Sequence, residues 1–98
     1  MSIIDLNLKE MSKLHIHYRD MKDDVLEAAQ KVILDTFENH KEERIIANKI
    51  RQEFDKVYGE SWNCIVGKNY GSHVIHQTEG YLFCTFNDEI SILLWKSS

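Results

Sequence analysis

Apolar residues between positions 25 and 37 recur every three or four places, which is the spacing of an amphipathic helix. This pattern predicts a helix over about 21–38. Asp20 stands before it in the position of an N-cap, and Asp23 follows three residues later, where a capping-box partner is expected. The first helix is therefore expected to begin directly after Asp20.

A second helical period begins at the acidic pair Glu42 and Glu43 and ends at Gly59, a residue that suits a helix C-cap. Its polar face alternates in charge sign, which is typical of a solvated helix surface. The period predicts a buried stripe made of Ile46, Ile50, Phe54 and Val57, widened by Ile45 and Ala47.

A period of two marks Leu14 to Tyr18 as a short, half-buried strand. Leu14, Ile16 and Tyr18 are expected on its buried side. His15 and His17 are expected together on the opposite side, because alternate side chains of a strand share a face.

Runs of aromatic and β-branched residues predict four more strands in the C-terminal half. Gly67 and Gly71 bracket a polar turn, and 87–89 is expected to be a hairpin loop. Together the elements predict one α+β domain over 14–98, with two helices packed on an antiparallel sheet and an N-terminal extension over 1–13. The four strands are expected at Trp62–Val66, Ser72–His76, Tyr81–Phe86 and Ile90–Trp95.

Composition narrows the class of partner. The chain has 98 residues, with 12 basic and 16 acidic side chains and a net charge of −4. This balance argues against nucleic acid as the main partner. No secretory signal or membrane-spanning run is visible, so a cytoplasmic protein is expected. Cys64 and Cys84 lie in apolar runs and are expected to be buried, reduced thiols.

The sequence offers little for catalysis or for a cofactor. His15 and His17 could supply two metal ligands, but His73 and His76, three apart in a strand, point to opposite faces. No Cys-x-x-Cys and no helical His-x-x-x-His accompanies them. Nothing near Cys64 would activate it as a nucleophile. We therefore expect no enzyme, no metal, no cofactor and no small-molecule substrate.

A small domain with several antiparallel strands and two helices has sheet edges to cover. Such an edge can pair with a second copy, or accept an extended peptide as an added strand. The strand near Ser72 to Ile75 suits either use, and composition alone leaves open that it is an ordinary internal strand.

Three stretches resemble the eight-kilodalton dynein light chain family. They are the segment Trp-Asn-Cys-Ile-Val-Gly-Lys-Asn-Tyr-Gly-Ser-His-Val-Ile-His at 62–76, the helix with Glu-Phe-Asp-Lys within 50–58, and the closing Ile-Leu-Leu-Trp-Lys-Ser at 92–97. The resemblance extends over 14–98 almost without gaps.

The resemblance implies a strand-swapped homodimer with a central β-sandwich and two symmetric grooves. Each groove would bind a disordered client segment, commonly built around Thr-Gln-Thr, as an added strand. The expected partners are the dynein intermediate chain and other disordered clients of a microtubule motor complex. The expected location is the cytoplasm and cytoskeleton, including the axoneme. The alternative is a specialised structural light chain confined to one dynein complex.

The resemblance also assigns residues to the two surfaces. Glu43 and Arg44 would cap the client glutamine, Tyr81 and Phe83 would line the groove floor, and a strand edge would pair with the client backbone. That edge comprises Asn69, Tyr70, Gly71, Ser72, His73, Val74, Ile75 and His76. The dimer interface would comprise Trp62, Asn63, Ile65, His73, Ile75 and Ser97.

Some positions depart from the family pattern. Asn63 stands where the family has an interface histidine whose protonation separates the subunits in acid, and His73 stands nearby in place of a tyrosine. Acid dissociation is thus expected to be lost or transferred to His73. Ile75 and Thr85 replace a threonine and a tyrosine of the groove, which predicts a more apolar client motif. Ser97 would place a phosphate close to its symmetry mate.

Overall fold

A computed structural model describes residues 13–68 and 80–97. The expected α+β class is confirmed within these ranges, with two helices and four strands. The predicted strand at 72–76 lies outside them. The elements are β1 (Leu14–Asp20), α2 (Asp23–Asn39), α3 (Glu43–Tyr58), β2 (Trp62–Lys68), β3 (Tyr81–Phe86) and β4 (Ile90–Lys96).

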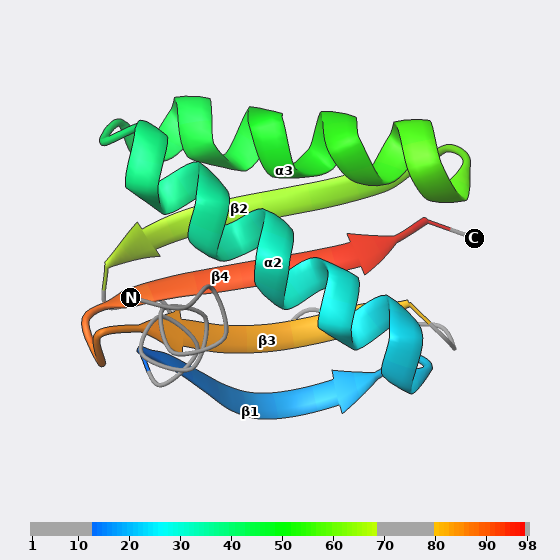
Figure 1. The fold of residues 1–98 in the computed structure, drawn as a ribbon, viewed down its shortest axis with the longest axis horizontal. Helices are drawn as coiled ribbons and strands as arrows, with labels where there is room; N and C mark the ends of the chain where they lie inside the picture. The colour runs from blue at the N-terminus through cyan, green and yellow to red at the C-terminus, as the bar shows by residue number, and fades with distance from the viewer. Residues whose placement is uncertain (1–12, 69–79, 98) are drawn as a thin grey trace, which may run out of the picture.

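The four strands form one antiparallel sheet in the order β1-β3-β4-β2. Both helices lie on the same face of this sheet, with α3 running along β2 and α2 crossing the middle strands (Figure 1). Neither of the two helices covers the other face, which we call the helix-free face. Among the described strands, β1 and β2 each have only one neighbour, so they form the two edges.

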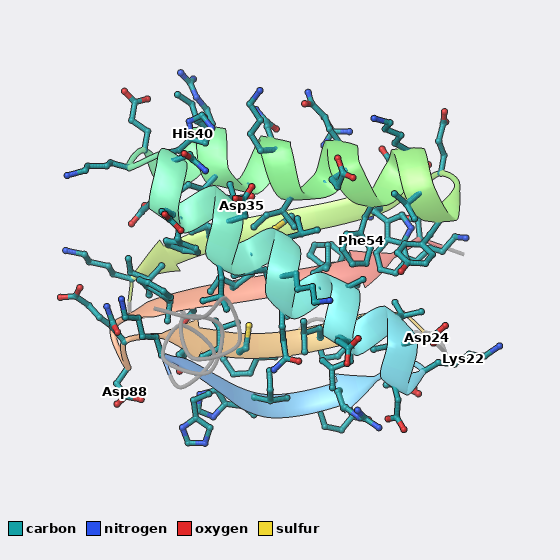
Figure 2. All side chains as sticks on the ribbon, viewed as in Figure 1. Lys22, Asp24, Asp35, His40, Phe54 and Asp88 are labelled. Atoms are coloured by element: carbon teal, nitrogen blue, oxygen red, sulfur yellow. The ribbon has the colours of Figure 1, made fainter. Side chains whose placement is uncertain are left out.

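The core lies between the helices and the sheet. Ile33 from α2 and Ile50 and Phe54 from α3 are almost completely buried against Leu82 and Ile92 of the middle strands. Phe54 points from α3 toward the sheet (Figure 2). Burial of side chains of this size contributes about 1.5–3 kcal/mol each, so this layer holds the helices in place.

The start of the first helix differs from the prediction. Asp20 is not the N-cap; it is the last residue of β1, pairs with Tyr81, and accepts a hydrogen bond from the Gly80 N–H on its carbonyl oxygen. The cap position belongs to Lys22, whose side chain makes no capping hydrogen bond. Strand pairing to β3 therefore overrides the local capping pattern.

The buried stripe of α3 is narrower than the period suggests. Ile46, Ile50 and Phe54 are buried, whereas Val57 is 57% exposed and Ile45 is 36% exposed. The helix lies over the edge strand β2, so a side chain at the margin of the stripe has no further strand beneath it. Gly59 is the C-cap, as predicted, with φ 83° and its N–H donating to the Asp55 carbonyl.

Two details of the strands also differ. The strand that begins at Trp62 does not end before Gly67: Gly67 pairs with Ser91 and Lys68 with Ile90, so Lys68 belongs to β2 and not to a turn. The ladder to β4 carries the strand past the glycine.

In β1 the register to β3 shifts between Ile16 and Tyr18, which leaves His17 as an extra, bulged residue. The bulge reverses the alternation. Tyr18 is therefore 48% exposed and packs edge-on against Tyr81, instead of lying on the buried side with Leu14 and Ile16.

Candidate functional site

The N-terminus of α3 opens onto a surface depression of about 710 Å³. Glu43 and Arg44, the predicted glutamine-capping pair, both line it. Its lining combines apolar side chains with charged side chains of both signs. Its other lining residues are Phe37, His40, Lys41, Glu42, Ile46, Lys68, Glu89 and Ile90.

Glu43 lies against the end of β2. A Cβ placed on Gly67 would lie 4.0 Å from the Glu43 Oε1 atom, an ordinary contact distance, so the carboxylate lies beside this part of the strand. The helix N-cap, Glu42, makes no side-chain hydrogen bond to the first turn. The first amide groups of a helix lack internal partners, and they form a local donor site with partial positive charge. The depression can therefore bind a hydrogen-bond acceptor at this helix end.

Lys68 and Glu89 were not anticipated at this site. Lys68 reaches it because β2 continues past Gly67, and Glu89 because Ile90, the next residue, pairs with Lys68 at the same end of the sheet. Neither residue shows a sequence signal for this position, since both contacts depend on sheet register.

The predicted groove-floor residues lie elsewhere. Phe83 is half-buried on the helix-free face, where it contacts the ring of His17 at a centroid distance of 5.1 Å. Tyr81, on the same side of β3, is buried and contacts Tyr18. Within one protomer, Glu43 and Arg44 thus both line the depression, whereas Tyr81 and Phe83 lie away from it on the helix-free face.

The predicted dimer residues cluster near the β2 edge. Asn63 Nδ2 donates a hydrogen bond of 2.6 Å to Ser97 Oγ. Ile65, two residues along the same strand, is 36% exposed. Trp62 differs: it packs inside the protomer against Phe54 and Tyr58. Asn63, Ile65 and Ser97 are the interface candidates that the structure places at the surface.

The remaining predicted positions, residues 69–76, lie outside the described ranges. They include the proposed strand edge and the two interface residues His73 and Ile75. The part of the site that the structure describes is therefore the α3 pocket, the β3 face and the β2 edge.

The thiols are unsuited to nucleophilic chemistry. Burial raises the pKa of Cys84 from an ordinary value of 9.0 to about 12. Burial also raises the pKa of Cys64, with a smaller contribution from Cys84. Cys84 is fully buried and Cys64 partly so. Both cysteines are free thiols, and a raised pKa keeps them in the unreactive protonated form at neutral pH.

Within residues 13–68 and 80–97, no three His, Cys, Asp or Glu side chains come together as metal ligands. Neither of the described helices is long and apolar enough to cross a membrane.

The arrangement of two helices over one face of an antiparallel sheet is found in solved dynein light chain-like domains. The dynein light chain-like domain of FhCaBP2, a calcium binding protein of Fasciola hepatica, superposes with a TM-score of 0.72 at 19% identity, over 88% of this chain and 93% of that one. A DLC-like domain of CsTAL3 gives a TM-score of 0.67 at 15% identity, over 88% and 94%. These likenesses establish the class of fold.

Sequence comparison establishes the family. The model of the family described as dynein light chain type 1 matches residues 13–97. A cytoplasmic dynein light chain of Emericella nidulans is 36% identical over 78 residues, which is 80% of this chain and 82% of the relative. The chain therefore belongs to the dynein light chain type 1 family, which is non-catalytic.

Proposed function

We propose that this protein is a homodimeric adaptor that binds short, disordered client segments by strand addition in two symmetric grooves. Its clients would include the intermediate chain of a dynein motor, which would place it in the cytoplasm on the cytoskeleton. Family membership supports an association with dynein. The adaptor role and the grooves rest on the surfaces described above.

The observation that carries the proposal is the helix-free face. Ile65 is 36% exposed there, and Phe83 and Trp95 remain partly exposed. Neither helix covers this face; Leu93 and Tyr81 are buried on it, and the exposed part around Ile65 is open to a layer from outside the two helices. A second copy of the sheet would supply it and give the β-sandwich that the family resemblance implies.

The distance between the two sets of predicted client residues also supports a dimer. Glu43 and Arg44 sit at a helix end, whereas Phe83 lies on the helix-free face of the sheet. One extended peptide could contact both sets if the groove were built from two subunits. The peptide would add to a strand edge, and its glutamine would reach the first turn of α3 in the manner of a side-chain cap.

Dimerisation would give the adaptor its affinity. A single site should be weak, because ordering a flexible segment costs conformational entropy. Two sites on one dimer hold the second segment of a paired client at high effective concentration. The protein would thus favour clients that are themselves paired.

Sedimentation velocity tests the dimer. Ile65→Glu would place a charge in the proposed interface and is expected to give a folded monomer. Val57→Glu is the matched control, because Val57 is also an exposed aliphatic residue, 57% exposed, but lies on α3. A dimeric Ile65→Glu protein, or loss of the dimer in both variants, would contradict the proposed interface.

Calorimetry tests client binding. A Thr-Gln-Thr peptide is expected to bind wild type, and Glu43→Ala should weaken it. Lack of binding by a folded, dimeric protein would instead favour the second candidate, a specialised light chain confined to one dynein complex. The observation that favours this alternative is Thr85, where the family groove has a tyrosine; here its hydroxyl is within 3.0 Å of His17 Nε2.

A further inference from the structure

The start of β1 and the facing part of β3 form a small row of rings on the helix-free face. The imidazoles of His15 and His17 are stacked, with centroids 4.4 Å apart and planes 20° from parallel. His17 also leans on Phe83 at 5.1 Å, and its Nε2 atom lies 3.0 Å from Thr85 Oγ1. We call these four residues the β1 ledge.

The bulge at His17 is what shapes this ledge. Before it, His15 pairs with Thr85; after it, Tyr18 pairs with Phe83. His17 has no paired residue in β3, and its ring contacts both Phe83 and Thr85 of that strand. Bulges often re-aim side chains at functional surfaces. As a result, the side chains of two consecutive residues, His17 and Tyr18, both lie on the helix-free face.

The ledge stands apart from the proposed dimer contact. The sheet order places β1 and β2 at opposite edges, with β3 and β4 between them. A second copy centred on Ile65 and Asn63 of β2 would therefore lie at the opposite side of this face from the ledge. Phe83 belongs both to the ledge and to the predicted groove floor, so the ledge is continuous with the proposed client site.

When both ledge histidines are protonated, their two positive charges have one carboxylate near them among the described residues. Among the described residues, the acidic contact is Asp88 of the β3–β4 turn, whose Oδ1 lies 3.9 Å from His15 Nδ1. Lys13 lines the same small depression as His15 and Asp88. Arg19 is turned to the helix side, where it pairs with Asp23 of α2. His17 thus has a hydroxyl and a ring as neighbours, but no described carboxylate within ion-pair distance.

We propose that the β1 ledge is a specificity-determining wall of the client groove, which selects client segments carrying an acidic side chain beside β1 and does so more strongly at mildly acidic pH. This inference rests on the proposed peptide-binding function. Two imidazoles in contact repel each other when both are charged, and a client carboxylate placed beside them relieves that repulsion. Histidine side chains change charge between about pH 5 and 8, so the selectivity follows pH in that range.

The test compares two Thr-Gln-Thr peptides that differ only in their flanking residues, which are aspartates in one and asparagines in the other. Calorimetry at about pH 7.5 and about pH 5.5 gives the affinity ratio of the two peptides; the aspartates remain ionised at both. The ratio is expected to rise about three- to fivefold at the lower pH, as for a partly exposed ion pair. Added salt should reduce it.

Substitutions at His15 and His17 test whether these residues cause the rise in the affinity ratio. His17→Gln and His15→Gln keep polar side chains and should remove most of the rise in the ratio. Lys31→Gln is the charge-matched control, because Lys31 lies on the exposed surface of α2 beside Glu27 and outside both proposed surfaces; it should leave the rise unchanged.

The outcomes distinguish failure of client selection by the β1 ledge from failure of the proposed peptide-binding function. If both peptides bind but their ratio does not change with pH, or if the rise persists in the His15→Gln, His17→Gln double variant, the ledge does not select clients and the adaptor function stands. If neither peptide binds the folded protein, the peptide-binding function fails and the ledge inference fails with it.

Discussion

At His17 a single inserted residue changes what strand β1 presents on each side. In an unbroken strand Arg19 would share a face with His15; the bulge moves it to the helix side, where it pairs with Asp23. Tyr18 moves the other way and contacts Tyr81. One residue thus gives α2 an ion pair and adds an aromatic ring to the helix-free face.

The β3–β4 turn contains two strained residues, and it offers a stability prediction. Asn87 and Asp88 have φ values of 55° and 54°, in the left-handed region. Asp88→Gly should raise the free energy of unfolding by about 0.5–1 kcal/mol, because glycine adopts this conformation without steric cost. Urea denaturation measures it. Asp88→Ala is the control: it keeps the Cβ and should destabilise, and a stabilising Asp88→Ala would contradict the strain argument.

The buried thiol of Cys84 predicts a loss of stability in alkali. Its pKa is 9.0 when exposed and about 12 in the fold, because burial disfavours the thiolate. The unfolded chain therefore releases the proton first. The stability contributed by this group is complete below about pH 9 and is lost as the pH rises toward 12, at about 1.4 kcal/mol per pH unit.

Urea denaturation of wild type and Cys84→Ala between about pH 8 and pH 11 isolates this effect from other titrating groups. The difference in unfolding free energy between the two proteins should be constant at lower pH and then shift against wild type. A difference that stays constant throughout would show that Cys84 keeps an ordinary pKa in the fold.

At the scale of elements, the helices illustrate how tertiary contacts override local signals. The first helix begins at Asp23 because Asp20 is held in the ladder to β3. This leaves Lys22 at the cap, a residue that offers no acceptor to the first turn and carries a charge of the wrong sign for a helix N-terminus. Figure 2 shows Lys22 at the end of α2, directed away from the molecule.

Lys22→Ser should therefore stabilise the protein by about 1 kcal/mol, since a serine hydroxyl can accept from the first-turn amides. Lys22→Ala separates the two contributions: it removes the unfavourable charge without adding an acceptor, and it should give a smaller gain. Thermal unfolding of the three proteins measures both. Equal stability of the serine and alanine variants would mean that the cap hydroxyl contributes nothing.

At the scale of the whole molecule, the two helices cover one face of the sheet, and the two proposed contact surfaces lie on the other face. The β2 end of that second face carries Asn63, Ile65 and Ser97, and the β1 end carries the ledge. Such a division lets the proposed dimer contact and the proposed client contact occupy one surface without competing.

This division leads to a prediction about acid stability of the proposed dimer. Asn63 is hydrogen-bonded to Ser97 and cannot become charged in acid. Asn63→His would place a titratable ring at the same point, and its protonation below about pH 6.5 should separate the subunits. Sedimentation at neutral and acidic pH is expected to show Asn63→His dissociating at a higher pH than wild type.

His73→Phe is the companion variant, since any acid dissociation of wild type is proposed to depend on His73. If wild type dissociates in acid and His73→Phe does so at the same pH, that assignment is wrong. If Asn63→His and wild type dissociate at one pH, position 63 does not lie at the subunit contact.

The sequence by itself determined the element types and the α+β class. The helical spacing of apolar residues such as Ile33, Ile46 and Ile50 indicates which face of each helix is buried, and all three are buried in the structure. An apolar helix face must be buried in any tertiary arrangement, so this part could be predicted. The pairing of His15 and His17 on one side of a strand was also predicted, because alternation is a local property of extended backbone. Client-capping residues such as Glu43 came from family resemblance, not from the period.

The tertiary structure decided everything that depends on register and on which edge an element covers. Val57 is exposed because α3 overhangs an edge strand; Lys68 reaches the α3 pocket because β2 runs on past Gly67; Tyr18 changes face because His17 is bulged. Such features arise from pairing between strands distant in sequence. A local pattern records how much apolar surface a segment must bury, and the partner strand decides where each side chain finally points.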